Sequence, residues 1–226
     1  MAIERIAHRG ARTELPENTL PAFERAFERG ADGIELDVHA TVDGVVVVHH
    51  DPDLRLPVSG DSRRISEMTW KEVHASRTAT GTSVPTLAEV LAVAPPPATV
   101  YVEIKALGVE RLVADVIGAS SARCAVHSFD HATIERFQEI APDVPRGLLF
   151  ESGLERLEDA VRRAAARDVW PHYTLVDAAL IERVRALGGR VIPWTVNDPA
   201  AARSLAEIGV DGICTDDVRI LDGGWV

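Results

Sequence analysis

The chain has 226 residues, a formal net charge of −11 and 46% hydrophobic residues. This length and composition are typical of one globular domain with a sizeable core, and they exclude a mainly disordered chain. The acidic balance argues against a general nucleic-acid-binding protein, which needs a basic face for phosphates, so any anionic ligand must be met by local cations.

The chain shows no membrane or secretion signal. It has no stretch of 18 apolar residues, and its first eight residues lack the basic and then apolar run of a signal peptide. We therefore expect a cytoplasmic protein with no stable membrane insertion. Cys124 and Cys214 show no metal-ligand spacing, and we expect them to be buried thiols rather than a disulfide.

Short β-branched runs alternate with longer segments of helical periodicity in the first half of the chain. The pattern predicts a helix with Asn18 or Thr19 as its N-cap and Gly30 as its stop. The segment 54–84 is polar and irregular. Strands are predicted at 3–7, 33–38, 45–49 and 99–105, and two more helices near 68–75 and at 86–93.

The second half keeps this alternation. Strands are predicted at 124–129, 146–150, 168–173, 190–196 and 212–215, and helices at about 109–118, 131–140, 154–166, 177–187 and 199–207. Strands joined by helical segments imply right-handed crossovers and a parallel sheet. Because no linker or repeat divides the chain, we expect one α/β domain, 1–226, folded as a single (β/α)8 TIM barrel. A short irregular insertion, about 52–85, follows the third strand.

One irregularity concerns the strand count, because nine strands are predicted for eight places in the barrel. The link from Asp37 to Val45 is also too short to hold a crossover helix. Either these two strands form a hairpin, or the connector runs extended along the barrel. The sequence leaves both open.

Polar residues gather where the early strands end, which is where the active site of a parallel barrel lies. Alternation along a strand places Glu35 and Asp37 on one face, and likewise Glu103 and Lys105. Lys105 stands out because only it and Lys71, among 24 basic residues, are lysine. The candidates at these strand ends are His8, Arg9, Gly10, Glu35, Asp37, His49, His50, Asp51, Glu103 and Lys105.

Three carboxylates, Glu35, Asp37 and Glu103, would repel one another at one barrel mouth unless protons or a cation intervene. All-oxygen ligands suit a hard divalent ion such as Mg²⁺ or Ca²⁺. The alternative is that Glu35 and Asp37 pair with arginines in an inert ion network.

The histidines are candidates for acid and base chemistry at neutral pH. His8 and one of His49 or His50 follow successive strands beside the carboxylates, and strand phase does not distinguish His49 from His50. The others are expected to be structural, although two of them end strands and could border the site (His127 and His172); the rest are His39, His74 and His131.

Short motifs follow one another in order from residue 7 to residue 216: His8-Arg9-Gly10, Pro16-Glu17-Asn18-Thr19, Glu35-Leu36-Asp37-Val38, Asp43-Gly44 with Val48-His49-His50-Asp51, Glu103-Ile104-Lys105, Ser128-Phe129-Asp130, Trp194-Thr195-Val196-Asn197 and Gly209-Val210-Asp211-Gly212-Ile213-Cys214-Thr215-Asp216. Each is weak alone. The ordered set resembles the glycerophosphodiester phosphodiesterase family across nearly the whole chain and is specific.

This resemblance implies a barrel enzyme that hydrolyses glycerophosphodiesters, such as glycerophosphocholine and glycerophosphoethanolamine, to glycerol 3-phosphate and an alcohol. The small-molecule diester is the expected partner, and a homodimer is left open. The resemblance implies these roles: His8 and His50 as the acid/base pair; Glu35, Asp37 and Glu103 as ligands of a divalent ion, Mg²⁺ or Ca²⁺; Arg9 and Lys105 as phosphate-binding residues; Phe129 and Trp194 as aromatic residues that border the glycerol or alcohol pocket.

One stretch departs from the family pattern. After the His-Asp pair the family commonly reads Leu-x-Arg-Thr-Thr, whereas this chain has Leu54-Arg55-Leu56-Pro57-Val58. The expected arginine is shifted or lost, which leaves substrate choice on that side open.

Two alternative functions are a related barrel phosphodiesterase acting on lysophospholipids and a catalytically inactive barrel that binds phosphodiesters or partners. The scattered apolar residues of 54–84, without an amphipathic helix, argue against the first. The complete set of candidate site residues argues against the second.

Overall fold

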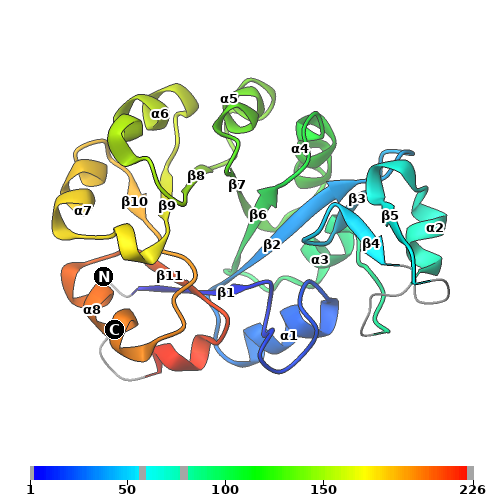
Figure 1. The fold of residues 1–226 in the computed structure, drawn as a ribbon, viewed down its shortest axis with the longest axis horizontal. Helices are drawn as coiled ribbons and strands as arrows, with labels where there is room; N and C mark the ends of the chain where they lie inside the picture. Colours follow the sequence, from blue (N-terminus) through cyan, green and yellow to red (C-terminus); the bar gives the residue numbers. More distant parts are fainter. Residues whose placement is uncertain (1–2, 56–59, 77–80, 223–226) are drawn as a thin grey trace.

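The chain folds as a nearly closed ring of parallel strands surrounded by helices (Figure 1). The computed structural model describes residues 3–55, 60–76 and 81–222. The expected (β/α)8 barrel is confirmed. In ring order its eight parallel strands are β1 (Glu4–His8), β2 (Gly33–Ala40), β6 (Thr99–Ile104), β7 (Arg123–Ser128), β8 (Arg146–Phe150), β9 (Asp168–Pro171), β10 (Arg190–Val191) and β11 (Gly212–Thr215).

The ring is joined where its path begins and ends. β1 pairs with β11 on one side and with β2 on the other. Between β10 and β11, the amide of Asp211 donates to the carbonyl of Val191 at 2.9 Å, and the amide of Cys214 donates to the carbonyl of Pro193 at 3.0 Å. Because closure leaves few unpaired backbone groups, the interior of the ring is a packed core rather than a sheet edge.

Helices cover the outside of the ring and bury their apolar faces against the strands. Polar N-caps start most of them: the Thr19 hydroxyl accepts from the amide of Ala22, and the Asp177 carboxylate accepts from the amide of Leu180. The helices are α1 (Leu20–Glu28), α3 (Leu87–Val93), α4 (Glu110–Gly118), α5 (His131–Ile140), α6 (Leu157–Ala164), α7 (Ala178–Arg185) and α8 (Pro199–Ile208).

The ninth predicted strand is β3 (Val46–Val48), and it is not part of the parallel ring. It runs antiparallel to β2, with Val38 opposite Val48, so of the two alternatives the hairpin is correct. Gly44 turns the chain with a φ of +81°, a conformation that glycine adopts without strain. The hairpin carries the chain out and back, so that the amide of His49 donates to the carbonyl of Asp37 at 3.0 Å and His50 follows directly after it.

The insertion after β3 packs around a small core of its own. It contains a two-stranded antiparallel sheet, β4 (Asp53–Arg55) and β5 (Ser62–Arg64), which the sequence pattern did not predict, and a helix, α2 (Trp70–Ala75). Of the stretch that departs from the family pattern, Leu56, Pro57 and Val58 lie outside the described residues.

Two minor expectations concern thiols and membrane spans. Both cysteines are free, as predicted; Cys214 is buried inside the ring, and Cys124 is only partly buried. Within the described ranges, no helix is both long and apolar enough to cross a membrane.

Candidate active site

A cavity of about 260 Å³ opens at the carboxyl ends of the parallel strands. Most of the residues that the sequence singled out line it: His8, Arg9, Glu35, His50, Glu103, Lys105, Phe129 and Trp194. The other lining residues are His127, Leu149, Glu151, Trp170 and Cys214. Asp37 does not line the cavity but contacts residues that do. Of the two neighbouring histidines, His50 lines the cavity and His49 does not. His50 is the one to which the resemblance gave the acid/base role.

Three buried side chains form a compact cluster in this cavity. One ligand atom from each of Glu35, Glu103 and His127 can be chosen so that all lie within 4.8 Å of one another. The Nε2 atom of His127 is 3.5 Å from Oε1 of Glu35, and the Nδ1 atom of His127 is buried without a hydrogen-bond partner. Two carboxylates and an imidazole at this spacing are able to hold a metal ion.

The two buried carboxyls of this cluster have too little positive charge around them to ionise at their ordinary pKa values. Burial, together with the neighbouring carboxylates, raises the pKa of Glu35 and that of Glu103 to about 7. Burial lowers the pKa of His127 to about 4, so its imidazole is neutral at pH 7 and keeps a free lone pair. A bound cation would remove the repulsion between the carboxylates, which fits a metal site.

Asp37 has a different environment, because it is already paired with two cations. Its Oδ2 atom is 3.1 Å from Nε of Arg9 and accepts from the Asn18 amide at 2.8 Å, and its Oδ1 atom lies 3.4 Å from Nζ of Lys105. Burial opposes ionisation, but these partners hold the pKa of Asp37 below its ordinary value. Asp37 is therefore an ionised carboxylate beside the cluster, and its Oδ1 atom makes no hydrogen bond.

Arg9 reaches the cavity because of an unusual backbone conformation after β1. Its φ of +57° lies in the left-handed region, and so does that of Gly10 at +82°. The Arg9 amide donates to the carbonyl of Glu35 at 2.9 Å, which fixes the turn against β2. A Cβ atom at Gly10 would lie 2.8 Å from the backbone of Ala22, so only glycine fits there. Such strain in a non-glycine residue is typical of functional sites.

His8 and His50 each have a carboxylate partner at Nδ1. The Nδ1 atom of His8 is 2.6 Å from Oδ1 of Asp216, and that of His50 is 2.7 Å from Oδ1 of Asp51. A carboxylate can only accept, so in each neutral imidazole the proton lies on Nδ1 and Nε2 is free to accept a proton. The Nε2 atom of His8 lies 3.9 Å from Oε2 of Glu35.

Phe129, which follows β7, and Trp194, which comes after β10, contact each other in the cavity. Their ring centroids are 5.2 Å apart with an interplanar angle of 80°. The Trp194 indole donates to the carbonyl of Trp170 at 2.9 Å, which fixes its ring, whereas the Phe129 side chain is 42% exposed. The two rings thus give the cavity an aromatic wall in addition to its charged groups.

Three residues of the site had no role in the sequence-based prediction. His127 was expected to be structural, although its place at the end of a strand was a signal. Asn18, predicted only as a possible helix N-cap, and Asp216 belong to motifs of the family resemblance but had no predicted role in the site. Pairing with Asp37 and with His8, respectively, explains their presence there.

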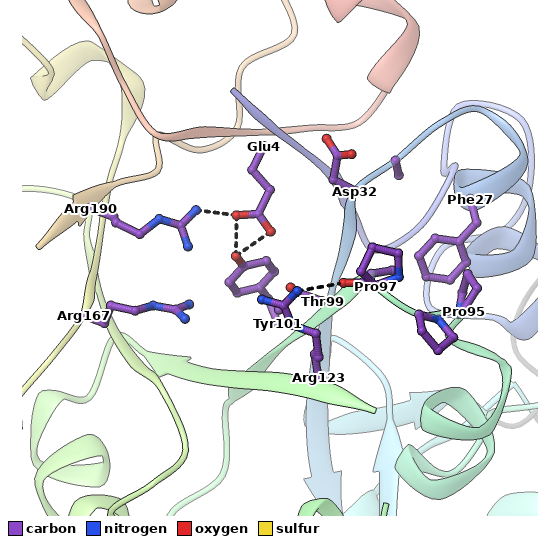
Figure 2. A pocket seen from close by; sticks show the side chains of 13 residues that line it. Glu4, Phe27, Asp32, Pro95, Pro97, Thr99, Tyr101, Arg123, Arg167 and Arg190 are labelled. Carbon is purple, nitrogen blue, oxygen red and sulfur yellow. Dashed lines mark hydrogen bonds and ion pairs between the residues drawn. The ribbon is translucent and has the colours of Figure 1, made fainter. Parts of the chain in front are cut away.

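A second, larger cavity of about 390 Å³ lies at the amino ends of the strands (Figure 2). There the Glu4 carboxylate accepts hydrogen bonds from the Tyr101 hydroxyl, at 2.7 and 2.8 Å, and from the guanidinium of Arg190. Asp168, buried beneath them, pairs with Arg167 and Arg190. The amino-end residues thus form a charge-matched network.

Comparisons with known proteins agree with the geometry of the carboxyl-end cavity. The chain is 33% identical, over 96% of its length and 95% of the relative's, to a glycerophosphodiester phosphodiesterase of Caldanaerobacter subterraneus. Its structure resembles that of the Thermotoga maritima glycerophosphodiester phosphodiesterase, with a TM-score of 0.80, 27% identity and 98% of each chain covered.

A phosphodiesterase of Oleispira antarctica shares the fold at 22% identity, with a TM-score of 0.87 and coverage of 96% and 94%. Residues 8–220 match the model of the glycerophosphoryl diester phosphodiesterase family, a range that includes every residue of the carboxyl-end cavity. The chain therefore belongs to this family and is a phosphoric diester hydrolase.

Proposed function

We propose that this enzyme hydrolyses glycerophosphodiesters, such as glycerophosphocholine and glycerophosphoethanolamine, to glycerol 3-phosphate and an alcohol, with the help of a divalent ion and two histidines. The observation that carries the proposal is that one cavity of about 260 Å³ contains three kinds of group: the imidazoles of His8 and His50, the cationic side chains of Arg9 and Lys105, and a cluster able to hold a metal ion. The Oleispira antarctica phosphodiesterase, which has the same fold, was crystallised with sn-glycerol-3-phosphate as its product.

Arg9 and Lys105 are placed to bind the phosphate. A guanidinium offers two parallel donors to phosphate oxygens, whereas the Lys105 ammonium acts as a compact charge. Although both side chains are partly buried, ion pairs with Asp37 and its neighbours raise their pKa values, so both stay charged. They offset the negative charge that would otherwise repel a nucleophile from a phosphodiester.

His8 and His50 are proposed as the acid/base pair. In each, the carboxylate partner at Nδ1 holds the ring and leaves Nε2 to exchange a proton with the substrate. One histidine would take the proton of the nucleophile, either water or the 2-hydroxyl of the glycerol, and the other would protonate the departing alcohol oxygen.

The cluster of Glu35, Glu103 and His127 suits a divalent ion because its carboxylates lack enough counter-charge and its imidazole is neutral. A divalent ion held there would neutralise charge that develops on the phosphate oxygens. The sequence-based set had Asp37 in place of His127. An oxygen-only set favours Mg²⁺ or Ca²⁺, whereas an imidazole ligand widens the choice toward transition metals.

The function is tested by incubating the purified enzyme with glycerophosphocholine and measuring released glycerol 3-phosphate. We expect turnover with Mg²⁺ or Ca²⁺ and its loss in excess EDTA, followed by recovery when the ion is returned. Lysophosphatidylcholine as the second substrate tests the alternative function. Faster turnover of the lysophospholipid, or turnover of neither substrate, would contradict the proposal.

The ligand set is tested separately by isothermal titration of Mg²⁺, Ca²⁺ and Mn²⁺ into metal-free protein. Loss of a cluster ligand should weaken binding by at least about tenfold, since even residues behind the ligands cost about 10- to 100-fold when changed. His127→Ala and Asp37→Asn are the matched pair. If only the Asp37→Asn variant loses affinity, the oxygen-only set holds the ion and His127 is structural.

A further inference from the structure

One side of the carboxyl-end cavity has no part in binding phosphate or metal. It contains Glu151, which directly follows β8 and lines the cavity together with Phe129 and Trp194. Glu151 is exposed and forms no hydrogen bond or ion pair with any residue in the described ranges. A carboxylate with no protein partner, inside a substrate cavity, is available to a ligand.

The two aromatic rings beside Glu151 suit a positive charge. Phe129 and Trp194 lie nearly at right angles, at 80°, so the rings form a corner in which one cation can contact both. Aromatic faces attract ammonium groups through the negative potential above the ring, and this attraction is the usual basis of choline recognition. An exposed phenylalanine at the cavity mouth is otherwise unfavourable in water.

The order of the strands places Glu151 across the ring from Arg9. Arg9 follows β1, which lies four places from β8 in the eight-stranded ring and therefore directly across from Glu151. Lys105 follows β6, next to β2. The cavity thus has Arg9 on one wall and Glu151 on the opposite wall, and Lys105 follows the strand that pairs with β7, after which Phe129 comes. A substrate that spans it would carry an anion at one end and a cation at the other.

We propose that Glu151, Phe129 and Trp194 form a subsite for the cationic alcohol of the substrate, so that the enzyme prefers diesters of ammonium alcohols over neutral ones. This inference rests on the proposed function and names its substrate class. The ammonium group of choline or ethanolamine would lie in the aromatic corner and pair with Glu151, while the phosphate would face Arg9 and Lys105.

The competing arrangement places the glycerol in this corner, with Glu151 accepting its hydroxyls. The two arrangements predict different selectivity. A glycerol subsite serves every glycerophosphodiester equally, whereas a cation subsite distinguishes their alcohols. Serine diesters give a further distinction, because their additional carboxylate would face Glu151 and be repelled.

The experiment measures kcat/KM for glycerophosphocholine, glycerophosphoethanolamine, glycerophosphoserine and the neutral glycerophosphoglycerol. The wild-type enzyme should prefer the first two over glycerophosphoglycerol by about tenfold, as one cation–π contact with a charge partner allows. Glu151→Gln should abolish most of this preference and change glycerophosphoglycerol turnover by less than about twofold.

Glu155→Gln is the matched control, because it removes the same charge from an exposed position nearby that does not line the cavity. The control should keep the wild-type preference. Equal losses for all substrates in Glu151→Gln would assign the corner to glycerol and overturn the inference. Turnover of every diester at one rate by the wild-type enzyme would also overturn it while leaving the proposed function intact, whereas turnover of none would contradict the function itself.

Inhibition by the free alcohol gives a second readout. Choline and its uncharged isostere 3,3-dimethyl-1-butanol should compete with glycerophosphoglycerol, and choline should have the lower inhibition constant. In Glu151→Gln the two constants should converge. Equal inhibition of the wild-type enzyme by both alcohols would show that charge plays no part in the corner, against the proposal.

Discussion

The two ends of the barrel both contain ionisable side chains, but their charges are balanced differently. At the amino end, Glu4 pairs with Arg190 and Asp168 pairs with Arg167 and Arg190. At the carboxyl end, three buried carboxylates face two cations, and one of those cations, Arg9, also pairs with Glu17. The amino end is charge-matched, and the carboxyl end is not.

This difference separates a structural network from a functional one. A matched network satisfies its own hydrogen bonds and needs no ligand, even around a cavity as large as 390 Å³ (Figure 2). An excess of buried carboxylate is unfavourable, and a bound cation would relieve it. In this barrel the size of a cavity is therefore a poorer guide to function than the balance of the charges that line it.

The largest expected effect follows from replacing His50 at the carboxyl end. His50→Ala should lower kcat/KM by at least about 100-fold, since a positioned acid or base typically contributes that much. Thermal unfolding should change little, because His50 is partly exposed. His74→Ala, which removes an exposed histidine of α2, is the control and should keep full activity. Near-normal turnover by His50→Ala would remove His50 from the mechanism.

A second large effect should appear in the stability of the metal-free protein as a function of pH. The folded state holds the protons of Glu35 and Glu103 more tightly than the unfolded chain does, because their pKa values are raised to about 7. The contribution of these two carboxyls to the free energy of unfolding should therefore fall as the pH rises from about 4.5 to 7, by up to about 3 kcal/mol for each, and stay level above.

Denaturant unfolding at a series of pH values measures this slope. Asp37 and Asp216, whose pKa values are lowered, titrate below the window. His39, His49 and His127, whose pKa values are lowered by burial, titrate within it and add stability as the pH rises, opposite to the two carboxyls. The Glu35→Gln, Glu103→Gln double variant keeps only the contribution of the histidines, so its stability should rise over this window relative to that of the wild-type protein, and the difference between the two slopes measures the carboxyls. A divalent ion at pH 8 should restabilise only the wild-type protein. An equal slope in both proteins would place the excess charge elsewhere.

The sequence predicted the barrel and most of the site because strand period, helix spacing and the polar strand ends are all local signals. His8, Glu35 and Glu103 could be placed in this way, since each was predicted near the carboxyl end of a strand, although β2 extends beyond Glu35 to Ala40. The β2–β3 hairpin could not be chosen, because a short link between strands is compatible with either direction of the second strand. Its antiparallel pairing depends on contacts with β2.

The exact partners in the site were also beyond the sequence. His127 has the same strand-end signal as His172, yet only His127 joins the carboxylates, because it points inward from β7 between Glu103 and Trp170. Asp37 shares a face with Glu35 but is drawn to Arg9 and Lys105. Which side chains pair in the site depends on distances across the ring, and these distances cannot be derived from the spacing of residues along the chain.

The smallest effects are expected at the amino end, where breaking the matched network should cost stability and leave catalysis unchanged. Arg190→Met deprives Glu4 and Asp168 of a guanidinium. Because the Arg190 side chain is 27% exposed, we expect a loss of about 1–3 kcal/mol in the free energy of unfolding, less than a fully buried pair would give. kcat/KM should stay within about twofold, since no described residue of this network lines the catalytic cavity.

Arg123→Met gives the matched comparison at the same cavity. Arg123 is exposed, and among the described residues its guanidinium donates only to the carbonyl of Pro97, at 3.3 Å, so its loss should change stability by less than about 0.5 kcal/mol. If Arg190→Met were as stable as Arg123→Met, the amino-end network would contribute nothing to folding. If Arg190→Met lowered kcat while leaving stability intact, the amino end would have a part in function. A purely structural ion pair affects the reaction only through the stability of the fold.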